Sequence, residues 1–101
     1  MRWLDTVSFK QLQPQMLLAI LRVEEACKEF MVQPWITSGS DGKHMQGSLH
    51  YEGRALDFRT RDIPAEHRVE FADFVKKALG PEFDVVLEQT HLHVEYQPKG
   101  G

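Results

Sequence analysis

Hydrophobic residues recur at helical spacing in two stretches of the chain. The first stretch follows Gln13-Pro14, where proline suits the first position of a helix. Apolar side chains then repeat every three or four residues, at Met16, Leu17, Ile20, Leu21, Val23, Cys27, Phe30 and Met31. This spacing predicts an amphipathic helix to about residue 31. The second stretch opens at Pro64 and stops at Gly80, which predicts another helix.

Shorter apolar stretches at residues 34–37, 54–60, 83–87 and 92–96 predict strands. In the second of these, Leu56 and Phe58 alternate with Asp57. Because side chains alternate across a strand, we expect Asp57 on the face opposite the two apolar residues. The last two stretches are close enough in sequence to pair as a hairpin.

The order of these elements predicts the fold class. Residues 38–47 contain three glycines, two serines and an aspartate, so we expect a loop there. The order is then helix, strand, loop, strand, helix, strand, strand, without regular βαβ alternation. It predicts one α+β domain over residues 1–101, with a small, mainly antiparallel sheet and helices on one face. The polar residues of the strands would lie on the other face and form the site.

Composition narrows the function classes. The 101 residues allow one modest core, and 42% hydrophobic and 27% charged residues are ordinary for a globular protein. The net charge of −3 gives no indication of nucleic-acid binding. Basic residues cluster locally at Arg54, Arg59 and Arg61, but the trio is too small for a phosphate-binding groove, and Asp57 and Asp62 interrupt it.

The single cysteine and the N-terminal segment give further expectations. Cys27 has no partner for an internal disulfide and is interpreted as a small core residue. The segment that starts Met-Arg-Trp-Leu-Asp-Thr has no long apolar stretch. We therefore expect no signal peptide, no membrane span and synthesis in the cytoplasm.

Four of the five histidines fall in two short segments together with carboxylates. The first segment contains His44, His50 and Asp57, and the second contains Glu88, His91 and His93. Catalytic zinc usually has three protein ligands and keeps a fourth position for water. His50, Asp57 and one histidine of the 91/93 pair form such a ligand set.

His91 and His93 lie two residues apart on a predicted strand, so their side chains should share a face. One would bind the metal and the other would lie beside it; their spacing does not choose between them. The fifth histidine, His67, is interpreted as a solvated surface residue, and Glu52 and Glu95 as ordinary surface carboxylates.

This ligand set suits a zinc hydrolase. The metal lowers the pKa of bound water to about 7. Glu88 is the nearest upstream carboxylate and could transfer the proton to the leaving group. His44 could donate a hydrogen bond to the developing oxyanion.

Two family patterns match these segments. Residues 48–57, Ser-Leu-His-Tyr-Glu-Gly-Arg-Ala-Leu-Asp, resemble the zinc-binding segment of hedgehog N-terminal signalling domains. They also fit the looser Ser-x-His-x-x-Gly-x-Ala-x-Asp pattern of the D-Ala-D-Ala metallopeptidases, which share that fold. His91-Leu92-His93 is similar to the hedgehog His-x-His segment, and His44 precedes His50 by six residues, as in hedgehog. The resemblance spans roughly residues 35–97.

The resemblance implies a role for each of the candidate residues. It gives His50, Asp57 and His93 as zinc ligands and Glu88 as the catalytic acid/base. His44 and His91 would flank the metal-bound water or the oxyanion. In many of the peptidases the acid stands three residues before the last ligand, a position that is Thr90 here.

The leading hypothesis is a zinc metallopeptidase that cleaves peptidoglycan stem peptides beside a D-residue. A bacterial or phage lysin acting on the cell wall is expected rather than an animal morphogen, because no autoprocessing domain or acidic calcium-binding cluster is seen. The alternative is a hedgehog-like, zinc-bearing binding module with little catalysis. Glu88 and His44 favour the enzyme, because a binding module needs no proton shuttle. A structural zinc site is disfavoured, since such sites are closed and rich in cysteine.

Overall fold

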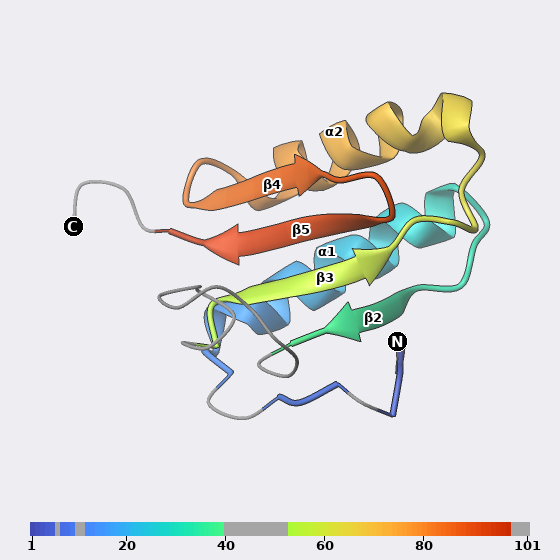
Figure 1. The fold of residues 1–101 in the computed structure, drawn as a ribbon. Coiled ribbons are helices and arrows are strands. Elements are labelled where there is room, and N and C mark those ends of the chain that lie inside the picture. Colours follow the sequence, from blue (N-terminus) through green and yellow to red (C-terminus); the bar gives the residue numbers. More distant parts are fainter. Residues whose placement is uncertain (6, 10–11, 40–52, 98–101) are drawn as a thin grey trace.

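The computed structural model describes residues 1–5, 7–9, 12–39 and 53–97. A five-stranded sheet lies against two helices (Figure 1). In chain order the elements are β1 (Arg2–Trp3), α1 (Gln15–Glu29), β2 (Trp35–Ser38), β3 (Ala55–Arg59), a short 3₁₀ turn (Ala65–His67), α2 (Arg68–Leu79), β4 (Phe83–Leu87) and β5 (His91–Tyr96). The predicted α+β class is confirmed.

The sheet order is β1-β2-β3-β5-β4. Only the β1–β2 pair is parallel; β2–β3, β3–β5 and β5–β4 are antiparallel. The mainly antiparallel sheet and the hairpin of β4 with β5 are therefore confirmed. The central position of β3 and β5 matters for the site, because these strands carry Asp57 and the His-x-His segment.

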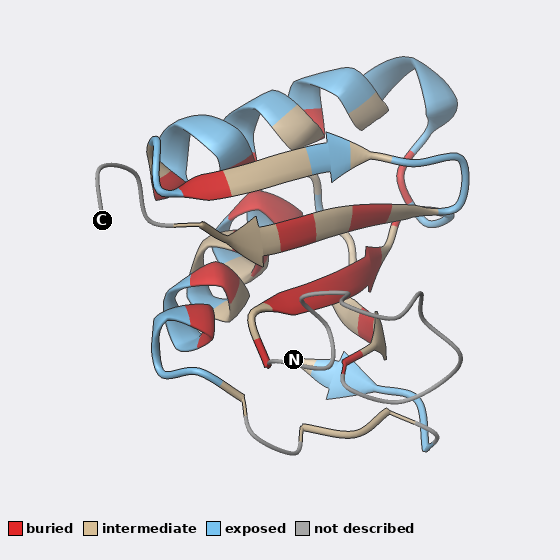
Figure 2. Ribbon diagram, turned by 60° about the vertical axis from the view of Figure 1, so that its left-hand side comes forward, coloured by how far each residue is buried: buried red, intermediate tan, exposed pale blue. Residues whose placement is uncertain are grey.

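Both helices cover the same face of the sheet, as predicted, and the buried residues gather between the two layers (Figure 2). The sheet contributes Leu56 and Phe58 from β3 and Leu92 and Val94 from β5, all at most 1% exposed. Burying side chains of this size contributes roughly 1.5–3 kcal/mol each. The alternation along β3 and β5 thus holds one face in the core and leaves the other for polar residues.

The C-terminal end of α2 agrees with the sequence signal, whereas α1 ends at Glu29, before the predicted end near residue 31. Gly80 follows α2 with φ 84, the left-handed region that glycine occupies without strain. The second helix opens with the 3₁₀ turn, so its α-helical part starts four residues after Pro64. None of the helices in the described ranges combines the length and apolar character needed to cross a bilayer.

Candidate functional site

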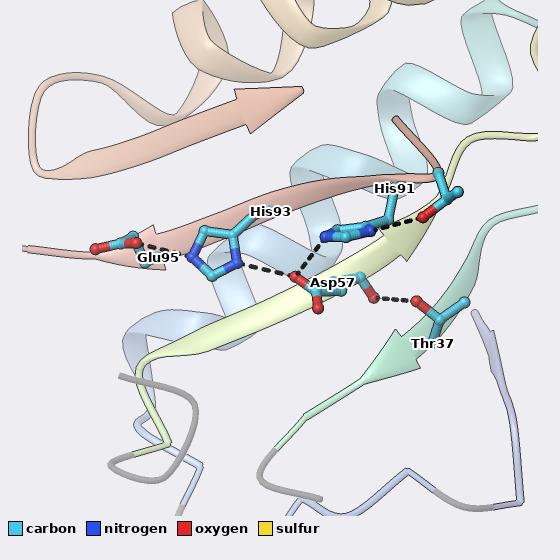
Figure 3. A network of polar contacts seen from close by, with 6 residues as sticks. Thr37, Asp57, His91, His93 and Glu95 are labelled. Carbon is cyan, nitrogen blue, oxygen red and sulfur yellow. Dashed lines mark hydrogen bonds and ion pairs between the residues drawn. The ribbon is translucent and has the colours of Figure 1, made fainter. Parts of the chain in front are cut away.

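The candidate site lies on the face of the sheet away from the helices, where β3 and β5 pair. Asp57 stands directly opposite His93 in the register of the two strands, and Arg59 stands opposite His91. Since Leu92 points into the core, His91 and His93 share the other face with Asp57 (Figure 3). The predicted common face of the two histidines is confirmed.

Asp57 is the centre of a short polar network (Figure 3). Its Oδ1 lies 2.9 Å from Nδ1 of His93 and 3.7 Å from Nε2 of His91. Its backbone oxygen lies 3.4 Å from the Thr37 hydroxyl of β2, which donates to it. The Asp57 side chain is only 12% exposed, so this carboxylate is largely removed from water. A buried carboxylate needs such partners, because an unpaired one is costly.

His93 lies between two carboxylates. Its Nδ1 faces Asp57, and its Nε2 lies 2.7 Å from Oε1 of Glu95. The hydrogen bond with Asp57 raises the pKa of His93 above its usual range; burial opposes the shift and Glu95 adds to it. In the metal-free protein both ring nitrogens can therefore carry a proton and donate.

Glu95 is part of this network and not an ordinary surface carboxylate, so that interpretation was wrong. It is half-buried, and its other oxygen accepts a hydrogen bond from the side-chain amide of Gln97. The signal was available in the sequence: His93 and Glu95 lie two apart on a predicted strand and must share a face.

The remaining predicted site residues are placed less fully. His44 and His50 lie outside the described residues. Glu88 is exposed at the end of β4, and its backbone N–H donates to the carbonyl of His91 at 2.8 Å. Within the described ranges its carboxylate makes no hydrogen bond or ion pair with Asp57, His91 or His93. The roles given to these residues stay predictions.

The donor set at Asp57 fits zinc as far as it is described. Two ligands about 2.0–2.1 Å from a tetrahedral zinc lie roughly 3.3 Å apart, and Asp57 Oδ1 and His93 Nδ1 are 2.9 Å apart. A metal-bound histidine commonly donates its other N–H to a carboxylate, and Glu95 is in that position. No group of three metal-binding side chains occurs within residues 1–5, 7–9, 12–39 and 53–97. The third predicted ligand, His50, lies outside the described residues, so the ligand set stays a prediction.

Comparison with known proteins identifies the family. The model of the hedgehog amino-terminal signalling domain matches residues 8–96. Over 66 residues, 63% of this chain, the sequence is 35% identical to Indian hedgehog protein and to Sonic hedgehog protein of Xenopus laevis. It is 33% identical to Tiggy-winkle hedgehog protein of Danio rerio over the same length. The matched segment spans 14–15% of the length of these relatives.

These findings overturn the zinc metallopeptidase hypothesis. The matching family model describes a signalling domain, and the relatives are hedgehog proteins. The predictions of a hydrolase and of a peptidoglycan substrate with a D-residue are therefore wrong, and the resemblance to D-Ala-D-Ala metallopeptidases finds no support. The physical reason is that the pattern of residues 48–57 predicts metal ligands, and a set of metal ligands does not by itself specify a function.

The binding-module alternative agrees with the family better than the enzyme does. The family match covers every described strand after β1 and both helices. It includes both segments that carry the candidate site, residues 48–57 and 91–93. The chain belongs to the family of hedgehog amino-terminal signalling domains.

Proposed function

We propose that this chain is a zinc-bearing recognition domain that binds a protein partner on the sheet face carrying Asp57, His91 and His93. The observation that supports this most directly is the chain of contacts from Asp57 through His93 to Glu95. Such an arrangement holds a histidine ring in one orientation and leaves one nitrogen and one carboxylate oxygen side by side.

His50, Asp57 and His93 would hold the zinc, with His91 beside it. Zinc bound there would hold the strand pair and the segment containing His50 together and add positive charge to the surface. Glu95 keeps the His93 ring oriented by accepting from Nε2. Thr90 holds the His91 ring through a contact of 3.1 Å between its hydroxyl and Nδ1, which leaves Nε2 facing Asp57.

Metal analysis of purified variants tests the ligand set. We expect about one zinc per chain in the wild type and a large loss in His93→Ala and Asp57→Asn. The matched control is His67→Ala, because His67 is an exposed histidine at the start of α2. Full zinc occupancy in both site variants would contradict the proposal.

A peptide-display selection tests the recognition role. The zinc-loaded protein is offered a random peptide library, and enriched peptides are titrated against the wild type, His93→Ala and His67→Ala. We expect peptides that bind the wild type and His67→Ala equally and lose affinity for His93→Ala or after chelation. Peptides that bind all of these alike would show that the face is not the recognition surface.

A further inference from the structure

A pocket of about 420 Å³ opens beside the His91 end of the site. It lies where β3 ends and β5 begins, because Arg59 and His91 face each other across the two strands and both line it. Its wall includes three arginines, of which Arg59 and Arg61 follow Asp57 in the chain and Arg68 begins α2. The pocket is thus adjacent to the candidate zinc site and shares His91 and Thr37 with its polar network, but the three arginines lie outside that network.

Two of the arginines are already held in place. Arg59 contacts one Asp62 oxygen through Nε at 2.8 Å and Nη2 at 2.7 Å, and its guanidinium lies 4.7 Å from the centre of the Trp35 ring. Arg68 donates from Nε to the carbonyl of Ile63 at 2.9 Å. Each guanidinium group is held along one edge, so its other N–H groups remain to donate hydrogen bonds to a ligand. Fixing a guanidinium in advance lowers the entropy cost of binding an anion.

Thr60 supplies an independent observation in the same pocket. It lines the pocket, is 0% exposed, and its hydroxyl has no hydrogen-bond partner within the described residues. Buried hydroxyls are nearly always paired, so such a group calls for an explanation. If the atoms that bury this hydroxyl moved, a ligand oxygen in the pocket would supply the missing hydrogen-bond partner.

The local charge indicates the ligand. Three guanidinium groups line the pocket and Asp62 pairs with one of them, whereas the whole chain carries −3. Positive charge is therefore concentrated in this pocket and does not form the extended basic surface that binds a nucleic-acid backbone. Guanidinium groups match the planar pair of oxygens of a carboxylate. A volume of this size accommodates a side chain or two of a peptide.

We propose that this pocket binds a carboxylate of an acidic peptide segment of the partner, through Arg59, Arg61 and Arg68 with Thr60 beneath them. The inference deepens the proposed recognition function, on which it rests: the partner would contact the zinc face and place an acidic group in the pocket. None of the four residues is a predicted metal ligand, so the two proposals can be separated by experiment.

The test is an NMR titration of the whole chain with a capped tetraglutamate peptide, a capped tetraglutamine peptide and inorganic phosphate. We expect shifts centred on Arg59, Thr60 and Arg68 with tetraglutamate, and at least about tenfold weaker binding of tetraglutamine. Arg68→Gln should lower tetraglutamate affinity about tenfold or more, because it removes a charged donor. Thr60→Val should lower it severalfold. The matched control, Arg22→Gln, removes a partly exposed arginine that pairs with Glu25 on α1 and should leave affinity unchanged.

Several results would contradict the proposal that the pocket binds a carboxylate. An equal loss of affinity in Arg68→Gln and Arg22→Gln would mean unspecific attraction between charges. Tighter binding of phosphate than of tetraglutamate would exclude a carboxylate as the preferred group. Absence of tetraglutamate binding to a wild type that holds one zinc would reject the pocket and leave the zinc proposal intact. Conversely, we expect tetraglutamate still to bind His93→Ala, which would support the pocket even if the zinc proposal failed.

Discussion

At the scale of single residues, the protonation and orientation of the His93 ring depend on the two carboxylates beside it. Asp57 and Glu95 approach the two ring nitrogens at 2.9 and 2.7 Å. A metal bound at His93 would compete with a proton for the nitrogen that faces Asp57, since only a deprotonated nitrogen binds a metal. Glu95 does not compete with a metal in this way, because Nε2 of His93, which it contacts, would stay protonated with or without a metal at Nδ1.

Glu95→Gln tests this positioning role. The amide can still contact the His93 ring but no longer carries the charge that increases the basicity of a metal-bound histidine. We expect zinc affinity to fall about 10–100-fold with the fold retained. Competition with a chromogenic chelator measures the affinity, and circular dichroism checks the fold. The exposed Glu29 provides the control as Glu29→Gln; unchanged affinity in Glu95→Gln would leave Glu95 without a part in metal binding.

Cys27 gives a second prediction at this scale. Burial raises the pKa of its thiol to about 12, and the charges of Asp62 and Glu24 add to the shift. The folded protein therefore keeps the thiol neutral at pH values where the unfolded chain, near 9, ionises. We expect slow reaction with a disulfide reagent at pH 8 unless the chain is unfolded, since the thiolate is the reactive form.

The same shift determines a pH dependence of stability. The contribution of Cys27 is fully present below about pH 9 and is lost as pH rises toward 12, because only the unfolded state releases its proton there. Urea titrations between pH 8 and pH 10 should show a decline in the free energy of unfolding that is smaller in Cys27→Ala. Equal declines in the two proteins would contradict the assignment.

At the scale of elements, the end of α1 contains an unusual residue. Val32 donates to the carbonyl of Cys27 at 2.9 Å and Met31 to that of Lys28 at 3.2 Å, the hydrogen bonds of a Schellman motif. Met31 occupies the left-handed position with φ 59, where glycine is usual, and is 92% exposed. Its side chain thus adds strain without packing.

Met31→Gly should therefore stabilise the protein by about 0.5–1 kcal/mol, because a left-handed conformation costs other residues roughly 1–2 kcal/mol and glycine little. Chemical denaturation measures the change. Met31→Ala is the control, since alanine removes the same exposed side chain but keeps the strain. A gain of equal size in Met31→Ala would show that the strain is not the cause.

The elements also show what the sequence could predict. The helical spacing of α1 and the alternation along β3 and β5 follow from burial of one face, so both were predictable, as was the common face of His91 and His93. β1 was not predicted, because a strand of two residues is too short to show an alternation of apolar and polar side chains. It is identified only by its hydrogen bonds to the chain at Pro34 and Ile36, both 3.2 Å.

At the scale of the whole molecule, the arginines that lie close in sequence are not the ones that lie together in space. Arg54, Arg59 and Arg61 form a trio in the sequence, but Arg54 donates to the carbonyl of Tyr96 at the far end of β5. Arg68 comes from α2 and takes its place at the pocket. Such a cluster depends on how the sheet and helix meet, which no local pattern contains. The function was misjudged for a related reason: a metal motif reports ligands, whereas catalysis depends on the groups around them.

Removal of zinc should lower the stability of the whole fold. The zinc would join β3, β5 and the segment containing His50, so binding it should stabilise the folded state. Zinc at about one hundred times its dissociation constant contributes roughly 2.7 kcal/mol. For a domain of this size each kcal/mol shifts the melting temperature by about 4–8 °C. We therefore expect chelation to lower Tm by roughly 10–20 °C in the wild type and in His67→Ala.

His93→Ala distinguishes loss of the metal from unspecific effects of the chelator. It should not respond to the chelator, because it has no zinc to lose, and it should melt at or below the temperature of the chelated wild type, because it also loses the contacts of His93 with Asp57 and Glu95. Calorimetry with and without added zinc measures both effects. A wild type that contains one zinc per chain but melts at the same temperature after its removal would mean that the metal is held without joining the strands. In that case zinc would act only on the recognition surface.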